Sequence, residues 1–523
     1  MLKRDGYTHS LWQDNHEPYL PVNKPDPKTI FDVIIVGGGI TGVSTAYQLQ
    51  KAGKKCLIIE AYNLCFGTTG GTTAHLNTLL DTPYSTIEKK FNEEKARLVA
   101  DSVQDALKLI KANIRDLDIR CEYEDADAYL FATDDKQVKD LEKIVEATVE
   151  AGLHMEFIDQ IPISQEFLKA AYITGQGKFN PIPYVMSLAA EFEKLGGRML
   201  TQSRVMEVKE EGDKLNVNTE TDTWIADQLI YATHIPPGVN LLHLRCVPWR
   251  SYALAATLAD DNYPDDLIYD MEDPYHYYRT QTINGEKFLI AGGKDHKTGH
   301  EENTERPFQL LEAHVRKYFD IKHMVNEWSS QYYESADGLP YIGHLPGTPE
   351  RIFVATGFGG NGMIYSSVAA IVLRDMLTGL DSPYENLYDP NRLKPVAGFS
   401  SFVQHNTGVI KEYFKKLIPF EKISTLSELA AGEGRLVRFG DHSIALSKDA
   451  WNRFHAVSPK CTHLGCEVQW NIAEQSWDCP CHGARYNTDG KVLNGPAHEG
   501  LDKIAVDGQR EIQANHKGLK KDF

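Results

Sequence analysis

Apolar runs and helical stripes alternate through the first part of the chain. An apolar run over Phe31–Val36 enters a glycine turn, apolar residues at helical spacing follow over Ile40–Leu49, and a second apolar run occupies Lys55–Glu60. A strand, a helix and a strand in this order predict a βαβ unit. Helical spacing also predicts helices over Lys89–Arg115 and Val185–Leu195.

The pattern changes in the last quarter of the chain. Before the change, a strand at Ile352–Ala355, a glycine cluster and a helix at Met363–Leu377 predict a second strand–loop–helix unit. The stretch Thr378–Ser400 contains three prolines and predicts a boundary. Val409–Ile418 carries an apolar stripe at helical spacing, which predicts a helix that bridges two domains. From Lys422 onward, short apolar runs between frequent glycines predict an all-β domain.

A chain of 523 residues is too long for a single core. The changes of pattern predict an α/β domain followed by a smaller all-β domain. The predicted segments are an N-terminal arm at 1–27, the α/β domain at 28–395, a linker with the bridging helix at 396–421, the all-β domain at 422–511 and a C-terminal tail at 512–523.

Charge and hydropathy restrict the partners. The formal net charge of -18 disfavours nucleic acid and anionic lipid, because like charges repel. The apolar stretches are far shorter than the roughly 20 residues that a membrane span needs. The first 23 residues carry no apolar segment typical of a secretion signal. We therefore expect no nucleic-acid partner, no transmembrane segment and a cytoplasmic location.

A glycine motif follows the first predicted strand. Gly37, Gly39 and Gly42 fit the G-x-G-x-x-G pattern, in which the glycines permit a tight turn, close approach of a pyrophosphate and close packing of the helix. The helix N-terminus then offers free N–H groups to phosphates. Glu60 ends the second strand and is placed to accept hydrogen bonds from a ribose. The predicted dinucleotide-binding residues are Gly37, Gly39, Ile40, Thr41, Gly42 and Glu60.

Three further segments indicate which dinucleotide is bound. The segment Gly67–His75 and the pair of motifs Gly338–Gly343 and Ala355–Met363 resemble the D-amino-acid oxidase/glycine oxidase superfamily of FAD-dependent oxidoreductases. The resemblance implies FAD as cofactor and a Rossmann-like FAD-binding domain with an interleaved α+β substrate domain. It also implies flavin contacts from Thr68, Thr69, Gly357, Gly359, Gly360, Asn361, Gly362 and Met363.

The same resemblance places the substrate cavity near the strand Pro274–Arg279, where Tyr278 and Arg279 are candidates for catalysis or binding. Arg279 or Arg250 is suited to bind a substrate carboxylate bidentately, and an ordinary surface or domain-interface arginine is the alternative interpretation. His75 is expected to contact flavin or substrate, and covalent attachment of FAD through this histidine is the alternative. No cysteine lies between Cys246 and Cys461, so a cysteine linkage to FAD is not expected.

The most specific motif lies in the predicted all-β domain. Cys461–Cys466 contains C-x-H and an additional cysteine, and Cys479–Gly483 contains C-x-x-H. Fifteen residues separate His463 of the first pair from Cys479 of the second. Two loops with these pairs can hold a four-ligand metal site. A Cys₂His₂ zinc site is the rival interpretation. The additional Cys466 and Cys481, at matching positions in the two loops, argue against it because a single zinc needs only four ligands.

This double motif resembles the Rieske family and implies a [2Fe–2S] cluster in which two imidazoles replace two thiolates. The resemblance assigns Cys461 and Cys479 to one iron, His463 and His482 to the other, and a disulfide to Cys466 and Cys481. Gly495–Pro496 is similar to the loop that covers the cluster in that family.

The chain departs from high-potential members of the family at one position. Ala484 replaces a serine that donates a hydrogen bond to a cluster sulfide, whereas Tyr486 keeps the place of a tyrosine donor. Losing a donor destabilises the reduced, more negative cluster, so we expect a lowered potential within the Rieske range. The chain shows no 2-His-1-carboxylate pattern typical of ring-hydroxylating oxygenases, which disfavours oxygenase chemistry.

Taken together, the motifs predict an FAD-dependent dehydrogenase of an amine, imino acid or amino acid that passes electrons through the cluster to an external acceptor. Two alternatives stay open. In one, the cluster delivers electrons from an external reductase to the flavin. In the other, the enzyme is a true oxidase whose cluster domain is a redox sensor.

Overall fold

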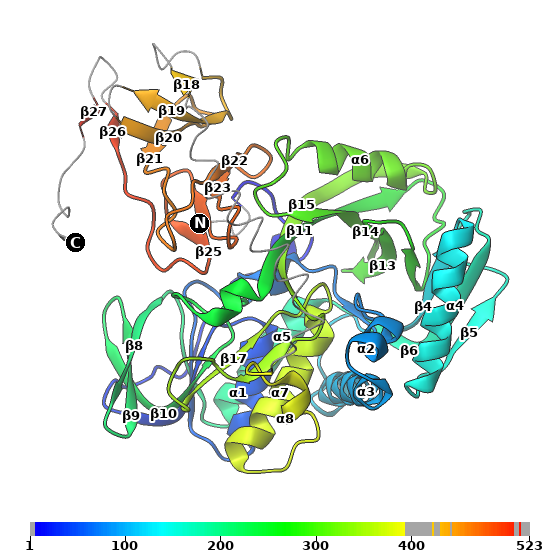
Figure 1. Ribbon diagram of the computed structural model, residues 1–523, viewed down its shortest axis with the longest axis horizontal. Helices are drawn as coiled ribbons and strands as arrows, with labels where there is room; N and C mark the ends of the chain where they lie inside the picture. Colours follow the sequence, from blue (N-terminus) through cyan, green and yellow to red (C-terminus); the bar gives the residue numbers. More distant parts are fainter. Residues whose placement is uncertain (1–5, 393–420, 423–428, 440–441, 507–511, 514–523) are drawn as a thin grey trace.

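The computed structural model describes residues 6–392, 421–422, 429–439, 442–506 and 512–513. Figure 1 shows the C-terminal strands gathered at one end of the molecule, beside the ends of the long strands of the preceding domain. We call residues 6–392 the N-terminal region and the described residues from 421 onward the C-terminal domain. The predicted bridging helix at 409–418 lies outside the described residues.

The first sheet contains the predicted βαβ unit. Its eight described strands include a path in the order β16-β17-β10-β1-β2-β7, where β1 pairs in parallel with both β2 and β10. Its strands are β1 (Ile30–Val36), β2 (Cys56–Ile59), β7 (Arg198–Leu200), β8 (Val205–Glu211), β9 (Lys214–Thr219), β10 (Thr223–Tyr231), β16 (Tyr341–His344) and β17 (Ile352–Thr356). Its helices are α1 (Ile40–Lys51), α5 (Pro181–Lys194) and α7 (Gly362–Thr378). The predicted strand–helix units are confirmed.

The second sheet is interleaved with the first along the chain. Its nine described strands follow the order β15-β11-β14-β13-β12-β4-β6-β3, with β5 paired to β6. They are β3 (His75–Leu76), β4 (Glu124–Ala132), β5 (Met155–Ile158), β6 (Lys169–Lys178), β11 (Cys246–Leu258), β12 (Leu267–Asp270), β13 (Tyr277–Ile283), β14 (Glu286–Lys297) and β15 (Ile321–Ser335). This interleaving agrees with the expected pair of cofactor and substrate domains.

The remaining helices of the N-terminal region are α2 (Tyr84–Lys90), α3 (Glu93–Asp116), α4 (Asp135–Glu150), α6 (Arg306–Val315) and α8 (Glu385–Tyr388). Short 3₁₀ turns are η1 (Gln13–Asn15), η2 (Thr68–Gly71) and η3 (Leu241–Leu244). The single helix predicted over 89–115 is wrong in its start. The Asn92 side chain accepts a hydrogen bond from the backbone N–H of Lys95 at 2.8 Å, so a new helix begins there and α2 ends before it.

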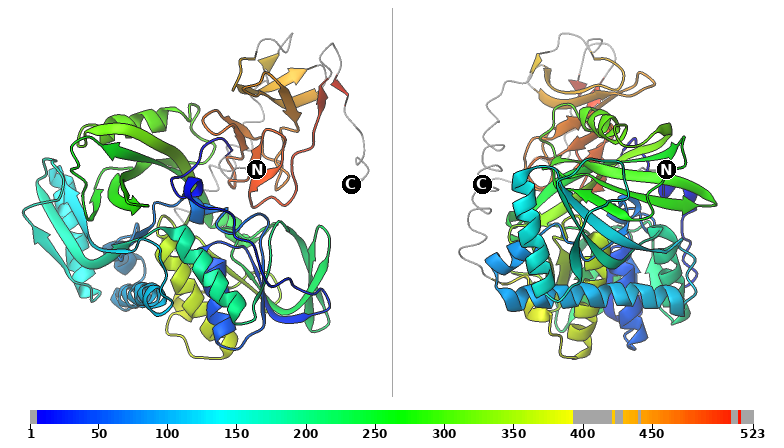
Figure 2. Two further views of the ribbon diagram at one scale, coloured as in Figure 1. Left: turned by 180° about the vertical axis from the view of Figure 1, so that it is seen from behind. Right: turned by 90° about the vertical axis from the view of Figure 1, so that its right-hand side faces the viewer.

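The C-terminal domain is all-β, as predicted (Figure 2). Two four-stranded sheets contain its strands: β18 (Glu421–Lys422), β19 (Gly434–Phe439), β20 (His442–Lys448) and β21 (Phe454–Val457) in one, and β22 (Gln469–Asn471), β23 (Ser476–Asp478), β24 (Arg485–Asn487) and β25 (Val492–Asn494) in the other. A short pair joins β26 (Ala505–Val506) to β27 (Ile512–Gln513).

The described part of the predicted N-terminal arm packs against the rest of the N-terminal region. The Trp12 side chain is fully buried, and its indole N–H donates a hydrogen bond to the carbonyl of Thr72 at 2.5 Å. The Arg279 guanidinium lies 5.5 Å from the centre of the Trp12 ring. The arm therefore supports the segment Gly67–His75 from behind.

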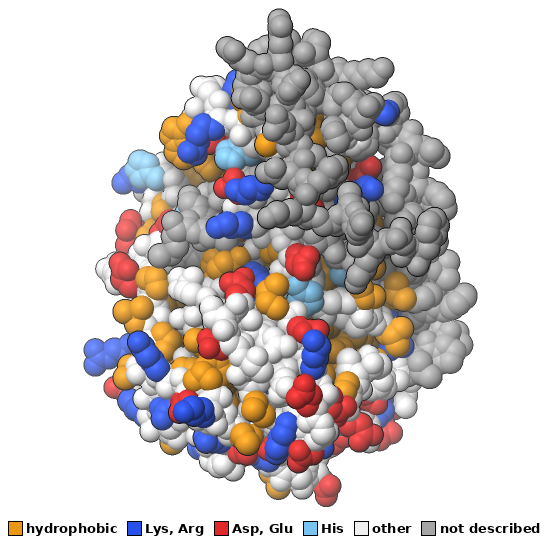
Figure 3. Space-filling view, turned by 90° about the vertical axis from the view of Figure 1, so that its left-hand side faces the viewer, with side chains coloured by type: hydrophobic (Ala, Val, Ile, Leu, Met, Phe, Trp, Pro, Cys, Tyr) orange, Lys and Arg blue, Asp and Glu red, His pale blue; other side chains and the backbone are white. Residues whose placement is uncertain are grey.

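Among the described helices, none has both the length and the apolar character needed to cross a membrane. On the face drawn in Figure 3, acidic and basic side chains are interspersed.

Candidate active site and metal centre

A cavity of about 300 Å³ lies against the glycine turn of the first sheet and the neighbouring face of the second. Two helices point their N-termini at it: α1, which follows Gly39, and α7, which follows Asn361. Free backbone N–H groups and the positive end of the helix dipole favour anions at such positions. This end of the cavity is built for the phosphates of a dinucleotide.

The glycines have different functions in the turn. A Cβ at Gly42 would lie 1.9 Å from the carbonyl oxygen of Gly37, so Gly42 lets α1 pack on the turn. A Cβ at Gly39 would meet only the Thr69 hydroxyl, at 3.0 Å, and Gly39 borders the cavity. Of the residues predicted to bind FAD, Gly42 and Gly357 do not line the cavity. Those that line it are Gly37, Gly39, Ile40, Thr41, Glu60, Thr68, Thr69, Gly359, Gly360, Asn361, Gly362 and Met363.

Glu60 lies at the end of the cavity where β2 ends. Its carboxylate accepts hydrogen bonds from the backbone N–H groups of Gly38 at 2.6 Å and Tyr62 at 2.7 Å. Burial raises the pKa of the Glu60 carboxyl. His498 and Gly495 of the C-terminal domain line the same cavity, so both domains enclose it.

The opposite end of the cavity is aromatic and acidic. Tyr277 and Tyr332 come from strands of the second sheet, and the carboxylates are Asp81 and Asp295. The His75 ring nitrogen Nδ1 is hydrogen-bonded to the Tyr269 hydroxyl. Burial, with help from the charge of Arg279, lowers the pKa of His75 well below its usual value, so this imidazole is neutral. The lining at this end comprises His75, Asn77, Asp81, Ser251, Tyr269, Tyr275, Tyr277, Asp295, Ser330 and Tyr332.

Strands β11 and β15 lie between the aromatic and acidic end of this cavity and the C-terminal domain. Ser251 pairs with Ser330 in the antiparallel register, and both line the cavity. The neighbouring pair, Arg250 and Gln331, points the other way: Gln331 donates a hydrogen bond to the carbonyl of Gly483 at 2.9 Å. Successive side chains of a strand alternate between faces. One pair of strands therefore carries cavity residues on one face and contacts to the C-terminal domain on the other.

The two cysteine–histidine loops meet where the C-terminal domain contacts these strands. The imidazole rings of His463 and His482 lie 4.9 Å apart at an angle of 83°. Within the described residues, Nδ1 of His463 is buried without a hydrogen-bond partner, whereas Nε2 lies 3.1 Å from the carbonyl oxygen of Gly238. A hydrogen bond from one ring nitrogen to a carbonyl fixes the tautomer that leaves the other nitrogen free for a metal. The histidine pair therefore fits an iron site.

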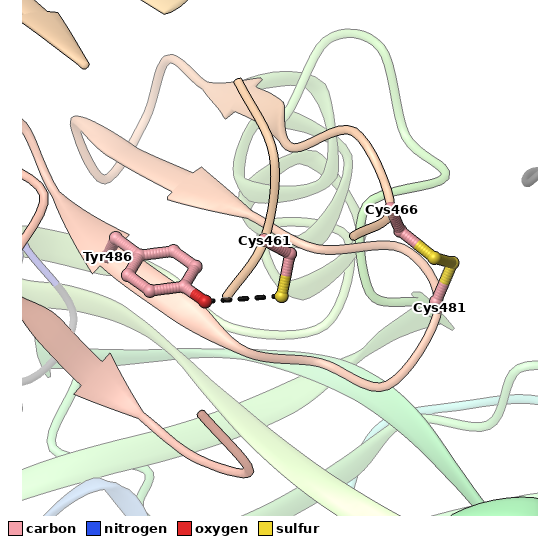
Figure 4. Close-up of a disulfide and its surroundings, with 4 residues drawn as sticks. All are labelled: Cys461, Cys466, Cys481 and Tyr486. Atoms are coloured by element: carbon pink, nitrogen blue, oxygen red, sulfur yellow. Dashed lines mark hydrogen bonds between the residues drawn. A yellow bond between two sulfur atoms is a disulfide. The ribbon is translucent and has the colours of Figure 1, made fainter. Parts of the chain in front are cut away.

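The thiols complete this arrangement. Cys461 and Cys479 are buried, and the Tyr486 hydroxyl lies 3.1 Å from Sγ of Cys461 (Figure 4). Hydrogen bonds from Cys479 and then from Tyr486 lower the pKa of Cys461 to about 7, which favours the thiolate that iron requires. Cys466 and Cys481 form a disulfide with a Cα–Cα distance of 6.6 Å, which joins the two loops beside the four candidate ligands.

A buried ion-pair network fastens the two domains together. Arg250 of β11 contacts the carboxylate of Glu474 at 2.6 Å, and Arg485 contacts the same carboxylate at 2.5 Å. Asp478 also pairs with Arg485, at 2.9 Å. Glu474 is thus the carboxylate shared by the guanidiniums of both domains.

Replacing Glu474 with glutamine should destabilise the protein by about 3 kcal/mol, because removal of one partner leaves a buried charge uncompensated. Arg485 keeps Asp478, so the cost falls mainly on Arg250. Urea unfolding followed by visible absorption and by far-ultraviolet circular dichroism measures the loss. Glu312→Gln, which breaks the more exposed pair with Arg316, is the control and should cost under about 1 kcal/mol. Equal losses in the two variants would contradict the assignment.

Comparison with known proteins agrees with this geometry. Residues 32–376 match the model of the FAD dependent oxidoreductase family, and residues 420–505 match that of the Rieske [2Fe-2S] domain. The chain belongs to the FAD dependent oxidoreductase family. Its C-terminal part is a Rieske domain.

Three relatives show how far the similarity extends. A Bacillus subtilis (strain 168) protein named as a Rieske 2Fe-2S iron-sulfur protein, YhfW, is 32% identical over 502 residues, which cover 95% of this chain and 98% of that protein. Gamma-glutamylputrescine oxidoreductase of Escherichia coli (strain K12) is 24% identical over 71% of this chain and 89% of its own length. The crystal structure of glycine oxidase from Geobacillus kaustophilus aligns with a TM-score of 0.59 at 17% identity, over 69% of this chain and 99% of that one.

The predicted cofactors are therefore confirmed as FAD and a Rieske [2Fe–2S] cluster. The glycine turn and the two helix N-termini fit FAD, and the paired thiols and imidazoles fit the cluster. The predicted fold class is also confirmed. The chain is an FAD-dependent oxidoreductase with an appended Rieske domain, and its N-terminal region has a fold similar to that of glycine oxidase.

Three of the four catalytic candidates lie outside the cavity. Arg250 faces the Rieske domain and pairs with Glu474, so the expectation that it binds a substrate carboxylate is corrected. Arg279 donates to the backbone carbonyls of Thr73 and Ala74 and supports the segment behind the flavin site. The Tyr278 hydroxyl contacts His314 at 2.6 Å in a separate buried network. Among the four, only His75 lines the cavity.

The cavity contains residues that sequence reasoning missed. Tyr277 faces it, whereas the neighbouring Tyr278 does not, because the two project from opposite faces of β13. The alternation of faces along a strand indicates that only one of these two tyrosines can face the cavity, but the sequence pattern does not show which one. Asp81, Asp295 and Tyr332 had no motif to mark them.

Tyr486 should set the reduction potential of the cluster. Its hydroxyl lies against Cys461, one of the candidate iron ligands, and a donor to sulfur stabilises the reduced cluster. Tyr486→Phe should therefore lower the potential by some tens of millivolts, where about 59 mV is tenfold for one electron. Ala484→Ser, at a fully buried position, should raise it. A redox titration followed by EPR measures both shifts, and a common sign for the two would contradict this prediction.

Proposed function

We propose that the protein is a dehydrogenase of a compound with a C–H bond next to nitrogen, and that its electrons leave singly through the Rieske domain. The observation that carries this proposal is the position of β11 and β15. One face of these strands lines the aromatic and acidic end of the cavity, which we call the substrate end, and the other face contacts the Rieske domain. A donor site and an exit site on opposite faces of one sheet suit short-range electron transfer.

The overall reaction balances as follows. The C–H bond breaks, the C–N bond becomes C=N, and two electrons with one proton leave as hydride while the N–H proton goes to solvent. FAD, when bound, accepts hydride, and the cluster passes one electron at a time. Two molecules of a one-electron acceptor protein or dye are therefore reduced in each turnover, and the proton of the hydride goes to solvent as the two electrons leave. Water then hydrolyses the released imine.

Residues of the N-terminal region contact the cluster histidine His463. The loop from Thr233 to Gly238 connects the cavity to the cluster site. His234, Ile235 and Pro237 line the cavity, and the carbonyl of Gly238, the last residue of the loop, accepts the hydrogen bond from His463. His243 lies edge-on to His463 with ring centres 4.6 Å apart. Burial lowers the pKa of His243 to about 4, so it packs on the ligand as a neutral ring. We assign Gly238 and His243 as positioning residues that hold the cluster histidine towards the cavity.

An anaerobic screen tests the proposal. Amines, imino acids and amino acids are added to the holoenzyme without oxygen, and the flavin absorption is followed together with the EPR signal of the reduced cluster. Bleaching of flavin followed by appearance of the cluster signal supports a path from flavin to cluster. Stoichiometric peroxide in air without cluster reduction would instead favour an oxidase, and flavin reduction only through a reduced external protein would favour the reverse path.

A further inference from the structure

The substrate end of the cavity carries negative charge without a matching cation. Of the described residues that line the whole cavity, Arg204 is the only arginine and none is a lysine. Arg204 belongs to the other end, where its charge acts on Glu60. His75 is neutral, and Arg279 is engaged by backbone carbonyls behind the wall. Among the described residues, none at this end offers a guanidinium or ammonium group to a substrate carboxylate.

The two carboxylates at this end are held in place by the chain. Asp81 accepts a hydrogen bond from the backbone N–H of Gly360 at 2.6 Å and from the Tyr275 hydroxyl at 3.0 Å. Asp295 accepts one from the Tyr332 hydroxyl at 2.9 Å. The other Asp295 oxygen, Oδ1, is buried and has no hydrogen-bond partner among the described residues. An acceptor of this kind is available to a ligand N–H.

Aromatic rings surround these carboxylates. The ring centres of Tyr275 and Tyr277 lie 5.9 Å apart, those of Tyr269 and Tyr275 lie 6.5 Å apart, and the His75 ring lies 5.3 Å from that of Tyr277. Tyrosine faces attract alkylammonium groups, and aromatic cages recognise them. Burial raises the pKa of Asp295 to about 6, and the charge of Asp81 contributes. A bound cation would relieve this repulsion.

We infer that the substrate end is a site for an alkylammonium cation without an α-carboxylate, held by Asp295 and by the faces of Tyr275 and Tyr277. The substrate class is thus an amine and not an amino acid. This inference rests on the proposed function for the chemistry, but the cation site itself can be measured without turnover.

Binding is tested with ligands of similar size and different charge. Tetramethylammonium, tert-butanol and pivalate are titrated into the oxidised holoenzyme at constant ionic strength, and the perturbation of the flavin absorption band is measured. We expect saturable binding of tetramethylammonium, at least tenfold tighter than that of pivalate. Asp295→Asn should weaken it at least tenfold, whereas Asp320→Asn, an exposed carboxylate outside the cavity, should not. Tighter binding of pivalate, or unchanged binding in Asp295→Asn, would overturn the inference.

A second pair of variants covers the case in which Asp295→Asn loses its flavin. Tyr277→Phe keeps the aromatic face and should keep tetramethylammonium binding, whereas Tyr277→Leu should weaken it. Pyrrolidine and proline, which differ by the carboxylate, are then compared as anaerobic reductants of the flavin. Reduction by proline alone would overturn the amine class and leave the dehydrogenase function standing. Cation binding without reduction by any amine would support the site and contradict the proposed function.

Discussion

Replacing Cys479 with serine should abolish steady turnover while it spares the first half of the reaction. Cys479 is a candidate iron ligand, and it lies in the loop whose carbonyls contact Gln331 and Tyr333. The FAD motifs all precede Arg392, so FAD should stay bound. Substrate should still reduce the flavin in one anaerobic turnover at a near-normal rate. Turnover with a one-electron acceptor should fall by about a hundredfold or more, equal to about 2.7 kcal/mol of barrier.

Stopped-flow absorption and steady-state assays separate these two effects. Cys56→Ser is the matched control, because Cys56 is a buried thiol in β2 that lies outside both cofactor sites and bonds only weakly to the carbonyl of Lys54. It should change neither rate. Normal turnover of Cys479→Ser with the physiological acceptor would mean that the cluster is not on the electron path and that the Rieske domain is a sensor or a docking module.

Replacing Gly39 with leucine should have the opposite result. A Cβ at Gly39 would lie 3.0 Å from the Thr69 hydroxyl, which is a side-chain atom and need shift only slightly, so the fold should survive. The rest of the leucine side chain would project into the space at the N-terminus of α1, where the pyrophosphate is expected. FAD affinity should fall by about tenfold or more, which is at least about 1.4 kcal/mol. The EPR spectrum of the reduced cluster should be unchanged.

Flavin content per chain and iron content per chain are the two measurements. Gly42→Leu provides a contrast, because its Cβ would collide with the carbonyl of Gly37 and force α1 away from the turn. That variant should lose stability as well as FAD. If Gly39→Leu bound FAD normally, the turn would not be the pyrophosphate site and the assignment of the glycine motif would be wrong.

Local sequence patterns were enough to predict the cofactors and the fold class of this protein. The glycine turn, the strand–helix units around it and the paired cysteine–histidine motifs each lie within a short stretch, so their spacing reports directly on a turn or a loop. The confirmed cofactors and fold class follow from these segments. The start of α3 was missed because a single side-chain cap at Asn92 divided one continuous apolar stripe.

Which strand residues face the substrate depended on long-range pairing. A shift of one residue moves a strand side chain to the opposite face of the sheet. Arg250 and Tyr278 therefore lie away from the cavity, while Ser251 and Tyr277 line it. The sequence around these positions is polar and aromatic on both faces, so its pattern favoured neither register.

The relation between the two cofactor domains belongs entirely to the tertiary structure. The sequence by itself determined that one chain carries an FAD site and a Rieske cluster, because each motif that marks these sites is a short stretch of neighbouring residues. It did not determine that Arg250 would meet Glu474, 224 residues later, or that Gly238 would receive the hydrogen bond of His463. Such contacts form only when surfaces from distant parts of the chain pack together. The pattern of neighbouring residues does not show which buried charge will pair with which partner.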